Sequence, residues 1–95
     1  MASAFETFDE LASALRGRAS SRAEETVGAS FDRRIADALD LVEHGEAPLG
    51  FDTLVSNIYE FDLPISENEF ARFQQVALAW GVADDAWAYL REVVR

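Results

Sequence analysis

Apolar residues recur at helical spacing through most of this chain, and that periodicity limits the fold more than any other feature. They fall on one face of a helix from Phe31 to Val42, from Leu49 to Phe61 and from Phe70 to Trp80. A further helix is expected near each end of the chain. No segment shows the strict alternation of a half-buried strand. The sequence therefore predicts an all-α fold, a single small bundle of four to five short helices.

Two helix starts are marked by capping boxes, in which a serine and the glutamate three residues later each bind the other's backbone N–H. The pairs are Ser3 with Glu6 and Ser66 with Glu69. Gly45 can take the left-handed conformation that often ends a helix. These local signals place the boundaries of the first, second and fourth predicted helices.

The chain divides into residues 1–28, an N-terminal helix and a linker, and residues 29–95, a helical domain. The first helix either packs on the core or forms a peripheral arm. The segment GRASSRAEETVGAS contains two glycines and few large apolar side chains, which favours a loop. Ser21 and Glu24 could still cap one short turn of helix there.

The last expected helix begins after Asp84 or Asp85, either of which could cap it. As an α-helix it would direct Trp87, Leu90 and Val94 inward. Two arginines near the end of the chain suit the negative C-terminal end of such a helix.

Carboxylates are concentrated in one stretch of a chain whose formal net charge is −10. Residues 35–71 hold nine Asp and Glu and no Lys or Arg, whereas residues 1–34 hold six acids against five arginines. Nucleic acids and anionic membranes bind clustered cations, so the composition argues against both as partners. Many domains are acidic only for solubility. The segregation of the acids favours the alternative, a surface for a basic protein.

The residues offer little for catalysis. The chain has no cysteine, and His44 is its only imidazole, without a local signature of a nucleophile pair. Asp40 and His44 are four residues apart and could reach one metal ion, but a structural zinc site uses four ligands. A role for His44 at the end of a helix or on the surface is favoured instead. We therefore expect no enzyme activity, no cofactor and no metal.

The helix expected over residues 49–61 carries carboxylates on its polar face. At about 100° per residue, Asp52, Asn57 and Glu60 fall opposite its apolar side. Tyr59 lies on the border, where it either anchors an interface or covers the core with its ring while its hydroxyl meets water. The candidate partner-binding residues come from this face and its flanking turns: Glu46, Asp52, Asn57, Tyr59, Glu60, Asp62 and Glu67.

Three short features of residues 31–94 point to a family. They are the Glu-x-Gly-Glu turn at residues 43–46, the pair Tyr59 and Glu60, and the Pro-Ile-Ser of residues 64–66 that opens the next helix. In these features the chain resembles the MafI-type immunity proteins of bacterial polymorphic toxin systems and related contact-dependent inhibition immunity proteins. The first 30 residues lie outside the resemblance. It implies a cytoplasmic antidote that binds a cognate toxin, often a nuclease, without chemistry of its own.

Two functional hypotheses follow. The first is an immunity protein that neutralises a basic, nuclease-type toxin through the acidic helical surface. The alternative is a small acidic regulatory or adaptor domain that binds another cytoplasmic protein, with the first helix as a docking arm. The N-terminal MASAFETFDE has acids where a secretory signal has positive charges, and no apolar run reaches the length of a membrane span. We therefore expect a cytoplasmic protein, whose oligomeric state the sequence leaves open.

Overall fold

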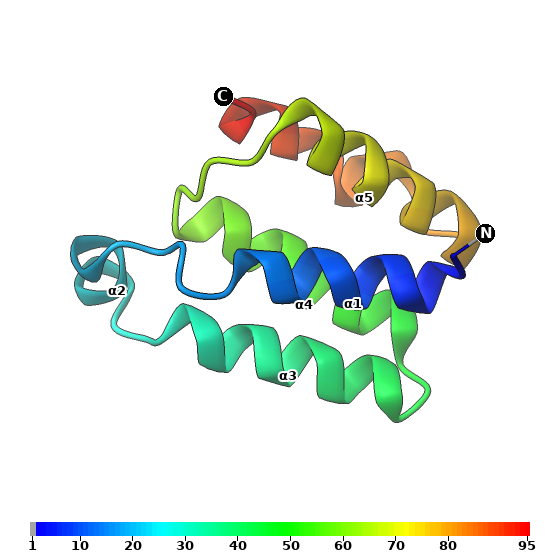
Figure 1. Cartoon of the computed structure of the whole chain (residues 1–95), viewed down its shortest axis with the longest axis horizontal. Helices are drawn as coiled ribbons and strands as arrows, with labels where there is room; N and C mark the ends of the chain where they lie inside the picture. The colour runs from blue at the N-terminus through cyan, green and yellow to red at the C-terminus, as the bar shows by residue number, and fades with distance from the viewer. Residues whose placement is uncertain (1) are drawn as a thin grey trace.

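The computed structural model describes residues 2–95, which form five α-helices and two short 3₁₀ segments (Figure 1). The α-helices are α1 (Ala4–Leu15), α2 (Ser21–Val27), α3 (Phe31–Glu43), α4 (Ala47–Glu60) and α5 (Glu67–Trp80). The 3₁₀ segments are η1 (Asp84–Ala86) and η2 (Ala88–Val93). Residues 2–95 contain no β-strand, only an isolated bridge between Ile65 and Val94. The all-α class is confirmed, and the expected four to five helices fall slightly short because the two 3₁₀ segments add to the five α-helices.

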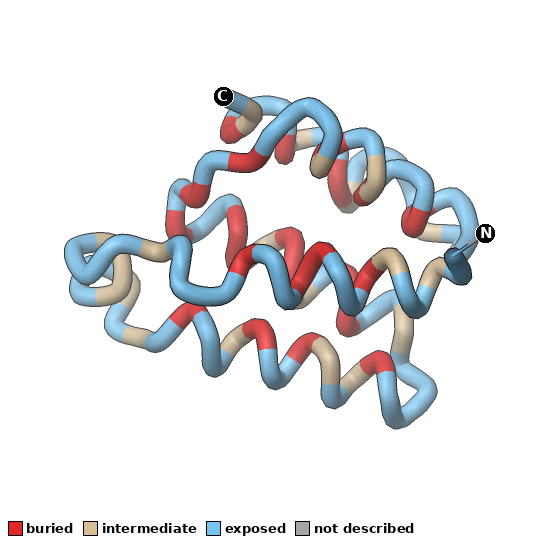
Figure 2. The backbone as a smooth tube through the Cα atoms, in the orientation of Figure 1, coloured by how far each residue is buried: buried red, intermediate tan, exposed pale blue. Residues whose placement is uncertain are grey.

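The four longer helices surround a core rich in phenylalanine. In Figure 1, α1 runs in front of α4, with α3 on one side and α5 on the other. The buried positions of these helices face one another across the interior (Figure 2). Phe51 of α4 is central, because its ring lies 6.4 Å from that of Phe8 and 6.2 Å from that of Phe73. No helix within residues 2–95 combines the length and apolar character needed to cross a membrane.

Helix α1 is part of this core. It begins with the predicted capping box and buries Phe8, Leu11, Ala12 and Leu15. Two ion pairs tie it and the turn after it to α5, one from Arg72 to Glu10 at 2.6 Å and one from Arg18 to Glu69 at 2.7 Å. Helix α1 thus packs on the core, which is one of the two arrangements that the sequence left open, and this packing gives less support to a role as a detachable docking arm.

The segment expected to be a loop contains α2. The Ser20 hydroxyl, rather than that of Ser21, caps the helix by accepting a hydrogen bond from the N–H of Ala23 at 3.0 Å. Gly28 ends it with a φ of 79°. None of its residues is fully buried. Only Ala23 and Val27 of this helix pack against the core, so its apolar side is too short for a search for periodicity to detect.

The turn between α3 and α4 follows the prediction closely. His44 is the C-cap of α3, and Gly45 has the expected positive φ, 86°. Helix α4 begins at Ala47, two residues before the predicted Leu49. Pro48 stands in its first turn, where a missing N–H costs no hydrogen bond.

Gly50 brings α3 and α4 into close contact. A Cβ atom at this position would lie 2.6 Å from the backbone oxygen of Ala38 and 2.6 Å from Cγ2 of Val42. Only glycine permits this approach of the two backbones. The contact fixes which side of α4 faces α3 and which side remains at the surface.

The C-terminal segment is 3₁₀ rather than α-helical, which changes the residues that it buries. With three residues per turn, positions three apart lie in line, and the structure buries Trp87, Leu90 and Val93. Val94, predicted to face inward, is only partly buried. Ala83 is the N-cap of η1 and makes no capping bond through its side chain, so neither aspartate has the predicted capping role.

Candidate partner-binding surface

Three of the seven predicted residues lie at the exposed outer side of α4. These are Asp52, Tyr59 and Glu60. Tyr59 is 43% exposed, which is unusual for a large side chain in this protein. Neither Asp52 nor Glu60 forms an ion pair with any residue in the described part of the chain. The outer side of α4 therefore combines an accessible aromatic ring with uncompensated carboxylates.

Tyr59 belongs to a small cluster that α4 and η2 build together. Its ring packs edge to face on that of Tyr89, with centroids 5.0 Å apart and planes at 87°. Its hydroxyl donates a hydrogen bond to the Glu92 carboxylate at 3.3 Å. Asp52 lies close enough to Tyr89 for its charge to affect that phenol. We call these four residues, Asp52, Tyr59, Tyr89 and Glu92, the tyrosine–acid cluster.

Both phenols of the cluster have a pKa above the ordinary value of tyrosine. The negative charge of Glu92, and then its hydrogen bond, raise the pKa of Tyr59 above the ordinary value of 10.0. Burial raises the pKa of Tyr89, and the charge of Asp52 adds to that effect. At neutral pH the cluster thus offers uncharged aromatic rings beside charged carboxylates. This combination suits an arginine or lysine side chain, which can lie over a ring and pair with an acid.

Tyr89 and Glu92 were missed in the sequence analysis. They lie about 30 residues beyond Tyr59 along the chain, and no local pattern links them to α4. Their own spacing held a usable signal, because residues three apart lie in line on a 3₁₀ segment. Residues three apart are also neighbours on an α-helix, but nothing in the sequence showed that this face lies beside α4.

Asn57 was wrongly placed on the outer face of α4. The side chain is buried, with an exposed fraction of 4% for the residue. Its Oδ1 accepts a hydrogen bond from Nη1 of Arg34 on α3 at 3.3 Å, and its Nδ2 donates to the backbone oxygen of Thr53 at 2.6 Å. The spacing of about 100° per residue placed Asn57 on the correct side of α4. It could not show that α3 covers that side. Asn57 is thus a polar contact between two helices.

Asp62 and Glu67 are exposed, but arginines near the end of the chain pair with both. Arg95 lies 2.9 Å from Asp62, and Arg91 lies 2.6 Å from Glu67. Residues 35–71 contain no Lys or Arg, but arginines from another part of the chain lie beside two of their carboxylates in the folded protein. These two carboxylates are less available to a partner than those of the tyrosine–acid cluster.

Glu46 lies at the other end of α4 from the cluster. It is exposed and occupies the N-cap position without a capping bond from its side chain. At 1.5 Å per residue it lies about 20 Å from Tyr59 along the helix. A partner that contacts both would have to cover the whole length of α4.

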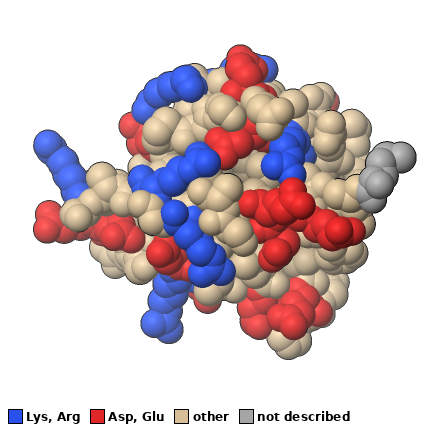
Figure 3. Space-filling model, in the orientation of Figure 1, with Lys and Arg blue, Asp and Glu red and all other residues tan. Residues whose placement is uncertain are grey.

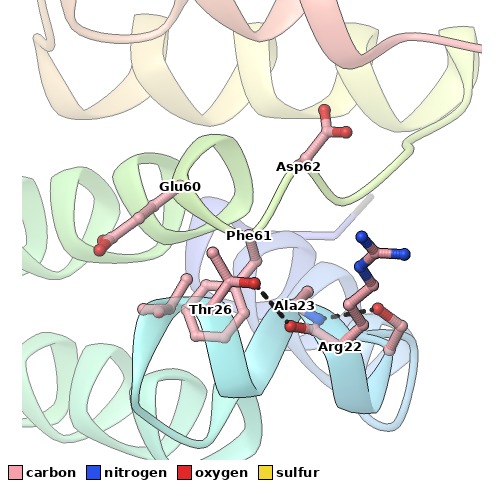
Figure 4. A pocket seen from close by; sticks show the side chains of 8 residues that line it. Arg22, Ala23, Thr26, Glu60, Phe61 and Asp62 are labelled. Carbon is pink, nitrogen blue, oxygen red and sulfur yellow. Dashed lines mark hydrogen bonds between the residues drawn. The ribbon is translucent and has the colours of Figure 1, made fainter.

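A shallow pocket of about 290 Å³ opens between α2 and the end of α4. Glu60 and Asp62 are among its lining residues, and Arg22 lies on the α2 side (Figure 4). The two carboxylates point in different directions in Figure 4, so they do not converge on one bound group. Within residues 2–95, no group of three or more His, Cys, Asp or Glu is placed to hold a metal ion.

His44 has the local role that the sequence favoured. Its Nδ1 lies 2.8 Å from the backbone oxygen of Asp40 and 3.4 Å from the carboxylate of the same residue. The bond to the backbone oxygen, and then the carboxylate charge, raise the pKa of His44 above 6.5. The ring is exposed and helps to close the last turn of α3.

The three features behind the expected resemblance to MafI-type immunity proteins all lie at helix ends. They form the turn from α3 to α4, the end of α4 and the start of α5. No family model matches the chain, and comparison with curated proteins and with solved structures gave no match either.

Proposed function

We propose that this protein is an immunity protein, an antidote that binds and neutralises a basic toxin domain of the nuclease type. The tyrosine–acid cluster is the observation that carries the proposal. Binding energy at protein interfaces is concentrated in a few aromatic and arginine contacts. An exposed tyrosine held in place by a second ring, with carboxylates around it, is suited to receive arginine side chains from a partner.

The overall charge supports the same kind of partner. A nuclease holds its polyanionic substrate in a basic cleft, and a strongly acidic protein is attracted to such a surface over long distances. Asp52, Glu60 and Glu92 have no ion-pair partner within residues 2–95, so the binding of a basic protein breaks no ion pair at these positions. The resemblance to MafI-type proteins implies the same role.

The adaptor alternative has less support. It relied on α1 as a docking arm, and α1 buries four residues in the core.

The experiment uses the toxin domain encoded beside this protein's gene, which the proposal expects to be the variable C-terminal part of a large secreted protein. Asp52→Lys combined with Glu60→Lys is expected to slow association about tenfold at low salt and to flatten its salt dependence, because steering by these charges is lost. Glu25→Lys, at an exposed acid on α2, serves as the control and is expected to change the rate less.

Stopped-flow association at several salt concentrations gives the rate, and growth of cells that express the toxin domain gives the protection. If the double variant associates and protects like the wild type, the outer side of α4 is not the interface.

A further inference from the structure

A groove that shares no residue with the tyrosine–acid cluster lies between α1 and α3. One turn of each helix faces the other across a space of about 350 Å³. Each turn contributes two apolar residues and one acid, namely Phe5, Phe8 and Asp9 from α1 and Leu39, Val42 and Glu43 from α3. α1 and α3 run side by side on the near side of the molecule in Figure 1.

The floor and walls of the groove are apolar and partly open. Phe8 is fully buried and Val42 nearly so, and these two form the floor. Phe5 is 55% exposed, although its ring packs on that of Trp80 with centroids 5.4 Å apart. The aromatic contact holds the exposed ring in place. An apolar side chain from outside would therefore find a preformed surface.

The rim of the groove is acidic. Asp9 and Glu43 are both exposed, and neither forms an ion pair with a described residue. Figure 3 shows this face of the molecule, with arginines over its left and centre and carboxylates without basic neighbours toward its lower right. The groove and its rim thus complement a ligand that is apolar at its centre and cationic around it.

We propose that this groove is a docking site for a basic segment of a partner protein that presents one large apolar side chain between arginines or lysines. The apolar side chain fills the space between Phe5 and Leu39, where its removal from water favours binding. The flanking cations pair with Asp9 and Glu43 at the rim. The inference does not depend on the proposed function, since it requires neither Tyr59 nor a toxin.

The test titrates the full-length ¹⁵N-labelled protein with a short capped peptide that carries a central leucine between arginines. Matched peptides carry glutamates in place of the arginines, or glycine in place of the leucine. The expected amide shifts are concentrated around the groove, and either peptide change weakens binding at least about tenfold.

Variants of the protein connect binding to the groove. Phe5→Ser, and separately Asp9→Asn with Glu43→Gln, are each expected to weaken binding of the arginine peptide about tenfold. Leu78→Ser is the control, because Leu78 is 72% exposed but does not line the groove. Far-UV circular dichroism checks that each variant is folded. The Asp9→Asn/Glu43→Gln variant keeps every apolar side chain, so it tests the groove without a loss of core packing.

Three results of the peptide titrations would overturn the proposal. The peptide could fail to bind, it could shift the tyrosine–acid cluster instead of the groove, or it could bind the Phe5→Ser and the Asp9→Asn/Glu43→Gln variants like the wild type. Sedimentation of the protein without peptide adds a further check. A dimer that dissociates in Phe5→Ser would show that a second copy of this chain occupies the groove, and the proposal of a basic partner segment would be wrong.

Discussion

Replacing Gly50 by alanine tests the contact between α3 and α4 that sets the orientation of the candidate surface. The new Cβ would lie 2.6 Å from Ala38 O and 2.6 Å from a methyl carbon of Val42, where carbon atoms normally keep roughly 3.5–4.0 Å. Overpacking of this kind costs about 1–3 kcal/mol, and the clash with a backbone atom places this case near the upper end. Alanine recovers about 1 kcal/mol through its higher helix propensity. We expect a net loss of about 2 kcal/mol in the free energy of unfolding.

Urea unfolding followed by circular dichroism measures this loss. The midpoint should fall while the slope with denaturant stays unchanged, because the surface exposed on unfolding is the same. In a Val42→Ala background the cost of Gly50→Ala should shrink by about 1 kcal/mol, since one of the two clashing groups is gone. A Gly50→Ala protein as stable as the wild type, or more stable, would refute the close approach of α3 and α4.

Three further substitutions test other parts of the account. Leu11→Ala, in α1, should cost about 3 kcal/mol in urea unfolding because Leu11 is only 1% exposed, and a loss below about 1 kcal/mol would mean that α1 is peripheral after all. Asn57→Ala should lower the free energy of unfolding by about 1–3 kcal/mol, because the partly buried guanidinium of Arg34 loses its hydrogen-bond acceptor; an unchanged melting temperature would contradict this. For Glu69, burial raises the carboxyl pKa, but hydrogen bonds from Arg18 and from a serine backbone outweigh burial and hold the pKa below 4.5. The ionised Glu69 carboxylate therefore stabilises the wild type above pH 4.5, and this contribution is lost as the pH falls through the lowered pKa. It amounts to roughly 0.5–1 kcal/mol, because Arg18 is partly exposed and water screens the pair. Glu69→Gln should lack that contribution, so its free energy of unfolding should fall less in acid than that of the wild type. An equal fall in both proteins would show that the Glu69–Arg18 pair does not contribute.

Local chemistry was predictable from the sequence. Both capping boxes form as expected, because each involves only a serine and a glutamate three residues apart. The turn at Gly45 after α3 is equally local, since it depends on the conformational freedom of one residue. The exposure of Asp52 and Glu60 also followed correctly from the period of a single helix.

Contacts between distant segments were not predictable in this way. The arginines that pair with Asp62 and Glu67 come from the end of the chain, so a count of charges along the sequence could not show that these acids are compensated. Tyr89 joins Tyr59 only because η2 packs beside α4. A single sequence therefore shows which side of each helix is apolar or polar, but it does not show which other segment packs against that side.

The affinity of this protein for the toxin domain encoded beside its gene, compared between Tyr59→Ala and Leu49→Ala, tests the central claim most directly. Both side chains are large, lie on α4 and are similarly exposed, at 43% and 50%. If the tyrosine–acid cluster is the binding hot spot, Tyr59→Ala should raise the Kd about 30-fold, which corresponds to about 2 kcal/mol, while Leu49→Ala should change it by less than about threefold. Equal affinities for Tyr59→Ala and the wild type, or a larger loss in Leu49→Ala, would contradict the account.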